Sequence, residues 1–247
     1  MSRVVAIVQA RLGSTRLPGK ALVPIQGKPM LQHVLERLAR ATRINETVVA
    51  TSDHPRDAAI LACAEHLGFR GIAGNEDDVL ARYIKAARFT AAEVVVRITA
   101  DCPLIDPALA DDVIEAFLRE DADYAANVIQ RTFPRGVETE VFWRTKLEEL
   151  DGIVTERYER EHVTPYFYLT HPEKHRLVSV EAKGELRRPD LRLCVDTPED
   201  LRLVREIFAR LAPQNPRFTT LDVIRLLDAE AALKALNAGI KQKELEE

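Results

Sequence analysis

A short apolar run at residues 4–8, Val-Val-Ala-Ile-Val, leads almost directly into a loop rich in glycine, hydroxyl groups and positive charge. This loop, residues 10–20, reads Ala-Arg-Leu-Gly-Ser-Thr-Arg-Leu-Pro-Gly-Lys. Glycine lets the backbone turn its N–H groups toward phosphate oxygens. Arg11, Arg16 and Lys20 add charge that backbone dipoles alone do not supply. We therefore expect a buried strand followed by a loop that holds a triphosphate.

The spacing of this loop separates it from two common phosphate-binding motifs. It has neither the Gly-x4-Gly-Lys-Ser/Thr pattern of P-loop ATPases nor the Gly-x-Gly-x-x-Gly pattern of dinucleotide-binding folds. A merely solvated loop is the alternative, but Ser14 and the turn formed by Pro18 and Gly19 argue against it.

Apolar runs and amphipathic stretches alternate along the chain. This alternation predicts an α/β protein with a mainly parallel sheet and helices on both faces, a three-layer α/β/α arrangement. A helix should begin after Thr197, because a capping residue is followed by a proline at the first helical position and then by two acids. Strands are expected at 3–9, 46–51, 69–72, 93–98, 177–181 and 190–195, and helices at 30–42, 56–67, 76–89, 107–119, 157–168, 197–210 and 219–236.

Length and composition fit one globular domain. The chain has 247 residues, of which 46% are apolar and 30% are charged. No repeat, low-complexity tract or Gly/Ser linker divides it, so we expect a single domain over residues 1–240 and a polar tail at 241–247. The stretch 123–176 interrupts the α/β alternation and is rich in aromatic and charged residues. It either packs on the edge of the sheet or forms a functional lobe.

Charge, hydropathy and cysteine usage exclude several classes of function. A net charge of −4 argues against a nucleic-acid partner. No apolar stretch approaches the roughly 20 residues that cross a bilayer, so we expect no membrane segment, no signal peptide and a cytoplasmic location. Cys63, Cys102 and Cys194 are an odd number without paired spacing, which predicts neither a disulfide framework nor a zinc site. Without a partnered base, Cys102 is expected to pack rather than to act as a nucleophile.

Further motifs follow the loop in a fixed order. They are Gly27-Lys-Pro-Met-Leu31, Thr99-Ala-Asp-Cys-Pro-Leu-Ile105, Pro134-x-Gly-x-Glu-x-Glu-Val-Phe142, Arg160-Glu-His-Val-Thr-Pro-Tyr166 and Val195-Asp-Thr-Pro-Glu-Asp-Leu201. Together with the loop they resemble the cytidylyltransferases that activate acidic sugars, the 3-deoxy-manno-octulosonate and acylneuraminate enzymes. They most resemble the branch typified by spore coat polysaccharide biosynthesis protein F. The resemblance implies a Rossmann-like nucleotidyltransferase domain related to glycosyltransferases of type A.

Two aspartates follow predicted strands. Asp101 comes after strand 93–98, and Asp196 comes after strand 190–195. Ligands of open α/β sheets bind beyond the carboxyl ends of the strands, so both side chains can converge on one divalent cation. Magnesium prefers carboxylate, water and phosphate oxygens and usually takes one or two protein carboxylates. We expect both aspartates to bind Mg²⁺ and to be catalytic together with Lys20. Taken alone, each is instead explained as a turn former or a helix cap.

The resemblance places Arg11 and Lys20 against the triphosphate of CTP. Arginine grips phosphate oxygens in pairs, whereas lysine acts as a mobile point charge. The backbone amides of Leu12 and Gly13 are candidates for reading the base. The expected nucleotide-binding residues are Arg11, Leu12, Gly13, Ser14, Arg16 and Lys20.

The acceptor side is expected to involve charged residues outside the loop. Glu138 and Glu140 are two residues apart, so on a strand they would face the same side. Arg160 would hold an acceptor carboxylate, while the two glutamates or His162 would bond sugar hydroxyls. Solvated surface charge and salt bridges within the fold are the alternatives. The candidate acceptor-binding residues are Arg82, Arg97, Glu138, Glu140, Arg160 and His162.

These features favour an Mg²⁺-dependent cytidylyltransferase that transfers CMP from CTP to a nonulosonic or octulosonic type of acidic sugar, releases pyrophosphate and serves surface polysaccharide synthesis. The resemblance also implies a homodimer formed through 123–176, with this excursion shaping the acceptor pocket. Ala-Asp-Cys-Pro at 100–103 replaces the Gly-Asp-Glu-Pro of the octulosonate enzymes, so their acceptor is not carried over. The alternatives are a nucleotidyltransferase that uses another base or a phosphonate or polyol phosphate acceptor, and a non-catalytic nucleotide-binding regulator.

Overall fold

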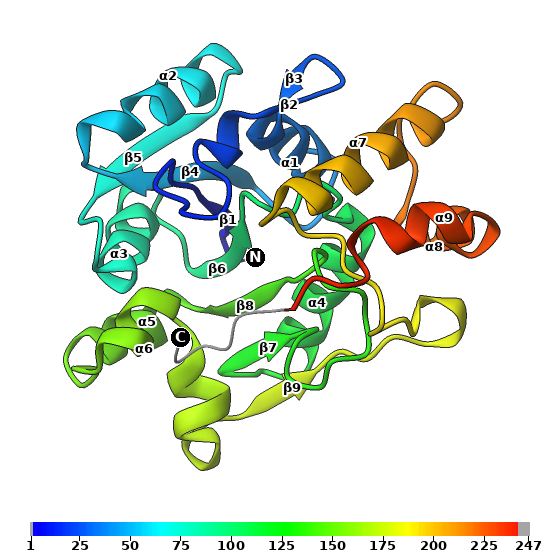
Figure 1. Ribbon diagram of the computed structural model, residues 1–247. Helices are drawn as coiled ribbons and strands as arrows, with labels where there is room; N and C mark the ends of the chain where they lie inside the picture. Colours follow the sequence, from blue (N-terminus) through cyan, green and yellow to red (C-terminus); the bar gives the residue numbers. More distant parts are fainter. Residues whose placement is uncertain (1, 242–247) are drawn as a thin grey trace.

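A computed structural model describes residues 2–241, and a seven-stranded sheet runs through its centre (Figure 1). The strands of this sheet are β1 (Val4–Gln9), β4 (Glu46–Ser52), β5 (Arg70–Gly74), β6 (Val94–Thr99), β7 (Tyr124–Ala126), β8 (Glu140–Trp143) and β9 (Leu177–Ser179). Their order is β5-β4-β1-β6-β8-β7-β9. β5, β4, β1 and β6 pair in parallel, as do β7 and β9. β8 is antiparallel to both of its neighbours, so the sheet is mainly parallel.

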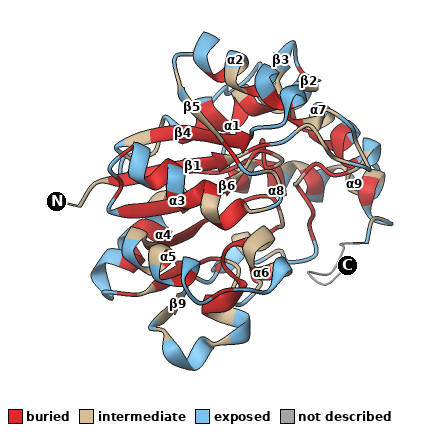
Figure 2. Ribbon diagram, turned by 90° about the vertical axis from the view of Figure 1, so that its left-hand side faces the viewer, coloured by how far each residue is buried: buried red, intermediate tan, exposed pale blue. Residues whose placement is uncertain are grey.

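The sheet is flanked by α1 (Met30–Leu38), α2 (Ala58–His66), α3 (Val79–Phe89), α4 (Pro107–Arg119), α5 (Arg144–Asp151) and α6 (Arg157–His162). Alternate residues of a strand face opposite sides. In β1, Val4, Ala6 and Val8 pack in one buried cluster with α1, α2 and α4, whereas Val5 and Ile7 pack in another with α3 and α5. Figure 2 shows the buried strands between helices whose outer surfaces are exposed.

The C-terminal part of the chain forms a third buried cluster beside the sheet. It contains α7 (Pro198–Leu211), α8 (Thr220–Ala229) and α9 (Ala231–Lys234), which pack near the hairpin of β2 (Pro24–Ile25) and β3 (Lys28–Pro29). Leu193, Val204 and Ile224 belong to this cluster. Short helical turns complete the chain, namely η1 (Lys20–Leu22), η2 (Pro55–Asp57), the π-helical η3 (Tyr166–Thr170), η4 (Pro172–Lys174), η5 (Gly184–Leu186) and η6 (Ala235–Asn237).

The predicted three-layer, mainly parallel α/β architecture is confirmed, and the helix predicted at 107–119 has the predicted bounds. The helix predicted at 157–168 ends at His162, because the backbone turns at the next residue and Pro165 lacks an N–H donor. The helix predicted at 219–236 is interrupted at Glu230.

Of the predicted polar tail, residues 242–247 lie outside the described residues. A search of the described chain for a helix with the length and hydropathy of a membrane span finds none.

The prediction of a strand at 190–195 is wrong. This segment is extended, but it does not join the sheet. Arg192 forms an isolated bridge with Arg135, and the Val195 N–H donates to the Asp101 carbonyl at 2.8 Å. The alternating apolar side chains that suggested a strand pack against α7 and α8 instead. The alternating apolar residues are therefore buried by helix packing and not by a place in the sheet.

The segment 123–176 contributes two strands to the interior of the sheet and does not simply cover its edge. β8 pairs directly with β6, and β7 pairs with β8. Neither strand was predicted, because each is short and the charged residue Glu140 begins β8. The helices α5 and α6 follow from the same segment.

Gly136 lies where the loop before β8 crosses the segment that precedes α7. Its φ is +100°, and a Cβ at this position would lie 2.4 Å from the backbone nitrogen of Cys194. Gly136→Ala should therefore lower the free energy of unfolding by about 2 kcal/mol or more, as measured by urea unfolding. Gly239→Ala is the matched control, since nothing lies within 4 Å of its added Cβ. Equal stability in the two variants would contradict the proposed crowding.

Candidate functional site

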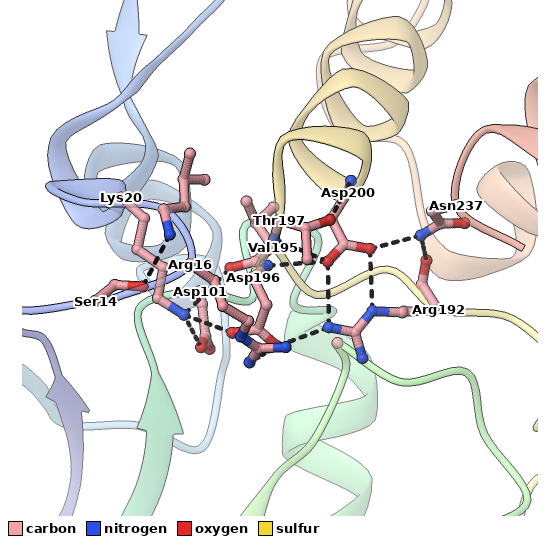
Figure 3. A network of polar contacts seen from close by, with 12 residues as sticks. Ser14, Arg16, Lys20, Asp101, Arg192, Val195, Asp196, Thr197, Asp200 and Asn237 are labelled. Carbon is pink, nitrogen blue, oxygen red and sulfur yellow. Dashed lines mark hydrogen bonds and ion pairs between the residues drawn. The ribbon is translucent and has the colours of Figure 1, made fainter. Parts of the chain in front are cut away.

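The ammonium group of Lys20 joins two carboxylates from distant parts of the chain (Figure 3). Lys20 Nζ donates to Asp101 Oδ2 at 2.7 Å and to Asp196 Oδ1 at 2.7 Å. It also donates to the Val195 carbonyl at 3.2 Å. The loop 10–20, the end of β6 and the start of α7 therefore meet at one point. The structure brings together all three residues that the sequence predicted to be catalytic.

Charge pairing controls the protonation of this centre. Burial opposes ionisation of Asp101, but the adjacent Lys20 ammonium outweighs it and lowers the pKa of Asp101 to about 2. Burial also opposes the charge on Lys20, whereas Asp101 and Asp196 together raise the pKa of Lys20. Asp101 and Lys20 are therefore both charged at neutral pH.

Asp196 contacts two further cations. Arg16 Nη2 lies 3.2 Å from Asp196 Oδ2, and Arg192 Nη2 donates to the same oxygen at 2.6 Å. Arg16 belongs to the predicted phosphate loop, so the loop cations and the carboxylates form one connected site. Arg192 was not predicted as a site residue.

The loop 10–20 is held by contacts that its own sequence does not reveal. Gly19 adopts a φ of +70°, which favours glycine, and its N–H donates to the Leu12 carbonyl at 3.1 Å. The N–H of Leu12 donates to Asp57 Oδ1 at 2.8 Å. The expectation that the Leu12 amide reads the base therefore needs correction, because a buried carboxylate occupies that amide. Asp57 carried no sequence signal, since 45 residues separate it from Leu12.

The other loop residues play smaller geometric roles. A Cβ added to Gly13 would lie 2.7 Å from Arg56 Nη2, so the loop backbone passes close to that side chain. Ser14 Oγ accepts a hydrogen bond from the Leu17 N–H at 3.3 Å and so stabilises the turn. Arg11 Nη2 lies 3.5 Å from Glu161 Oε1, with 43% and 35% of the two side chains exposed. Such an exposed pair contributes little to stability, so Arg11 remains available to a ligand.

Arg97 and Glu140 lie opposite each other on β6 and β8 and form a buried ion pair. Glu140 Oε2 also accepts hydrogen bonds from the hydroxyl groups of Tyr124 at 2.7 Å and Thr164 at 2.5 Å. Burial opposes the charge of Arg97, but Glu140 raises its pKa. Two of the predicted acceptor residues therefore share one buried network.

A strained turn at Val163 connects this network to His162. Val163 has a φ of +72° and a ψ of −50°, and the Thr164 N–H donates to the His162 carbonyl at 2.9 Å, which together define a γ-turn. This conformation is unfavourable for a β-branched residue, and Val163 is only 1% exposed, so surrounding packing must maintain it. Burial and the nearby Arg97 lower the pKa of His162, which is therefore neutral at pH 7.

Glu138 precedes β8 and does not share a strand with Glu140, contrary to the expected pairing. Its Oε1 accepts from Arg131 Nη1 at 3.0 Å, and its Oε2 accepts from the Gly136 N–H at 2.6 Å. Cys102 Sγ lies 3.8 Å from Glu138. Burial raises the pKa of the Cys102 thiol well above its ordinary value, which leaves it protonated. Glu138 therefore shapes the loop beside the residue that follows Asp101.

Arg82 and Arg160 differ in how their guanidinium groups are occupied. Arg82 is 1% exposed and donates from Nη1 to the Asn75 carbonyl at 3.2 Å. Its Nε and Nη2 have no hydrogen-bond partner among the described residues. Arg160 donates to Asp78 Oδ2 at 2.6 Å and to Asp151 Oδ1 at 2.7 Å. Its guanidinium therefore ties α6 to the start of α3, where the sequence had suggested an acceptor contact.

The donor set at the centre fits a hard divalent cation. Magnesium binds oxygen ligands and commonly combines one or two carboxylates with water and phosphate. Asp101 and Asp196 provide two such carboxylates. Within residues 2–241, no group of three or more His, Cys, Asp or Glu side chains is arranged to hold a metal ion. The remaining ligands would come from water and the nucleotide.

The pairing of Asp101 with Lys20 makes stability depend on pH. The folded-state pKa of about 2 lies below the ordinary 3.8, so this stabilisation is complete above about pH 4 and is lost as the pH falls through about 2. Lys20→Met should remove roughly 2 kcal/mol from the difference in unfolding free energy between about pH 5 and pH 2. Urea unfolding at both pH values measures it. Lys28→Met, at an exposed pair with Glu36, is the control. An unchanged pH dependence in Lys20→Met would refute the coupling.

Comparison with known proteins identifies the family. The family model described as cytidylyltransferase matches residues 5–242. The chain is 33% identical over 233 residues to spore coat polysaccharide biosynthesis protein SpsF of Bacillus subtilis, an alignment that covers 92% of this chain and 95% of that protein.

Solved structures agree with this assignment. A cytidylyltransferase from Leptospira borgpetersenii is similar with a TM-score of 0.90 and 30% identity, over 99% of this chain and 100% of that chain. A CMP:2-keto-3-deoxy-manno-octonic acid synthetase complexed with CTP shares the fold, with a TM-score of 0.63, 22% identity and coverage of 85% and 99%. The predicted resemblance is confirmed, and the chain belongs to the cytidylyltransferase family of nucleotidyltransferases.

Proposed function

We propose that this cytidylyltransferase transfers CMP from CTP to an acidic sugar of the nonulosonic or octulosonic type, with Mg²⁺ and release of pyrophosphate, in the cytoplasm. The observation that carries the proposal is the meeting of Asp101 and Asp196 at Lys20, at the end of the phosphate loop. Carboxylates beside loop cations suit a metal-bound triphosphate. The names of the relatives, which mention CTP, an octonic acid and polysaccharide biosynthesis, support the choice of nucleotide, acceptor and pathway.

The loop cations hold the nucleotide in this proposal. Arg11 and Arg16 bind phosphate oxygens, and Gly13 and Ser14 shape the turn that carries them. Lys20 is charged and close to both aspartates, so it can neutralise negative charge that grows on the departing pyrophosphate.

Asp101 and Asp196 are the residues that would hold Mg²⁺. The metal would supply a Lewis acid that neutralises the triphosphate and polarises the α-phosphate. Lys20 keeps the two carboxylates close together, and its ammonium group, which contacts one oxygen of each, would move aside toward the phosphates when the metal binds.

The acceptor binds, in our proposal, beside Arg97 and Glu140. Among the described residues, Arg97 Nε and two guanidinium nitrogens of Arg82 have no hydrogen-bond partner, which supports a contact with a sugar carboxylate. Glu138 and neutral His162 are suited to hydroxyl groups. An acceptor oxygen forms a bond to the α-phosphorus of CTP as the bond to pyrophosphate breaks. Positioning and charge neutralisation suffice, and no covalent enzyme intermediate is required.

Pyrophosphate release is the direct test. The assay combines Mg²⁺ and each nucleoside triphosphate with a panel of acidic sugars, phosphonates and polyol phosphates, and mass spectrometry identifies the product. We expect a CMP-linked acidic sugar. Faster turnover with another nucleotide would overturn the choice of base, and a phosphonate or polyol phosphate product would overturn the acceptor class. CTP binding without turnover across the whole panel would favour the non-catalytic regulator.

Removal of either metal-binding charge should abolish most of the activity. Asp101→Asn and Asp196→Asn should each lower turnover by at least about a hundredfold, equivalent to about 2.7 kcal/mol of transition-state stabilisation, while the fold persists. Titration of pyrophosphate release with Mg²⁺ measures this effect. The exposed Asp121→Asn is a matched control and should retain activity. Near-normal turnover in either site variant would remove that residue from the metal role.

We also propose that the excursion 123–176 pairs two subunits. It exposes the apolar side chains of Ile153 and Leu169, each 55% accessible, which a subunit contact would cover. Light scattering should give about twice the 27.8 kDa chain mass. Leu169→Asp should shift the protein toward the monomer, whereas Leu118→Asp, at an exposed residue of α4, should not. A fully active wild-type monomer would rule out both the dimer and a shared acceptor pocket.

A further inference from the structure

A buried hydrogen-bond network lies behind Asp196 and extends to the C-terminal segment (Figure 3). Its first member is Arg192, which lies four residues before Asp196 in an extended segment. Arg192 Nη2 donates to Asp196 Oδ2 at 2.6 Å, and Arg192 Nε donates to Asp200 Oδ1 at 3.0 Å. The guanidinium therefore lies between the proposed metal-binding carboxylate and a second carboxylate.

Asp200 is the anchor of this network, and its side chain is fully buried. Its Oδ2 accepts hydrogen bonds from the backbone N–H groups of Asp196 and Thr197, both at 3.1 Å, and so fixes the backbone that carries the Asp196 side chain. Burial opposes ionisation of Asp200, but the hydrogen bonds from Arg192 and Asn237 lower its pKa. Asp200 is therefore a charged side chain that holds the Asp196 backbone by a hydrogen bond.

Asn237 connects this pair to the C-terminal segment. Its Nδ2 donates to Asp200 Oδ1 at 2.8 Å and to the Arg192 carbonyl at 3.0 Å. Asn237 is buried, so these hydrogen bonds are shielded from solvent. One side-chain amide therefore fixes both Asp200 and the backbone of Arg192.

The arrangement limits where the charge of Arg192 acts. Without Asp200, the guanidinium would interact more strongly with Asp196 and compete with any cation for that carboxylate. Asp200 shares the positive charge, and Asn237 holds Asp200 in the orientation that allows this sharing. Hydrogen bonds behind a metal-binding carboxylate commonly orient it and alter metal affinity.

We propose that Asn237 is a positioning residue that acts through Asp200 and Arg192 to orient the Asp196 carboxylate for metal binding. The inference rests on the proposed metal role of Asp196. It extends the functional site to η6, at the far end of the chain from the phosphate loop. A purely structural role, in which Asn237 only fastens the C-terminal segment to the core, is the alternative that an experiment must separate.

Metal affinity and stability separate the two roles. The affinity for Mn²⁺ is measured by water proton relaxation in the presence of saturating CTP and without an acceptor, and stability is measured by urea unfolding. Asn237→Ala should weaken Mn²⁺ binding by about tenfold or more. Leu233→Ala is the matched control, because this buried residue of α9 packs in the same C-terminal cluster and its apolar side chain cannot hydrogen-bond to the network. It should lose stability while keeping Mn²⁺ affinity within about twofold.

Two further variants make the result decisive. Asp200→Asn preserves the shape of the side chain and should also weaken Mn²⁺ binding by about tenfold or more, which keeps the test valid if Asn237→Ala does not fold. Normal Mn²⁺ affinity in the folded Asn237→Ala or Asp200→Asn protein would overturn the positioning role. A tenfold loss in Leu233→Ala would overturn it equally. Unchanged affinity in Asp196→Asn would instead refute the metal role proposed above, and the positioning role with it.

Discussion

Two carboxylates repel each other unless a cation lies between them, and Lys20 supplies that cation here. Its ammonium group holds the ends of three segments that are far apart in the sequence, the phosphate loop, the turn after β6 and the turn before α7. If the ammonium were removed, the same carboxylates would favour separation of these segments. The proposed nucleotide and metal sites therefore share one electrostatic origin, and neither can be altered without affecting the other.

The sequence predicted those parts of the fold whose signals are local. The run in β1 and the capping box at the start of α7 need no distant partner to be recognised. β7 and β8 were missed because they are short and β8 begins with a charged residue, which is buried only because it pairs with Arg97 across the sheet. The prediction of a strand at 190–195 was wrong for the opposite reason. The alternating apolar pattern is present, but its side chains pack against helices and the segment does not join the sheet.

The candidate site shows the same division. Lys20, Asp101 and Asp196 were predicted together, because residue type and motif order pointed to them. Asp57 and Asn237 were not, since the hydrogen bonds of Asp57 with Leu12 and of Asn237 with Arg192 each span 45 positions along the chain. Charge alone also fails to identify a partner. Arg160 was a reasonable acceptor candidate, yet the structure commits its guanidinium to Asp78 and Asp151.

The buried pair of Arg97 and Glu140 illustrates why some charged residues are better explained by function than by stability. Desolvation offsets much of the attraction in such a pair, and in other proteins apolar side chains of similar size often replace one without loss of stability. The burial of these two charges is therefore weak evidence that they stabilise the fold. Glu140 is also bound by Tyr124 and Thr164, and Thr164 is placed by the strained turn at Val163. Arg97 on β6, Tyr124 on β7 and Thr164 after α6 thus hold Glu140 in place, which fits the acceptor role that we propose for this pair.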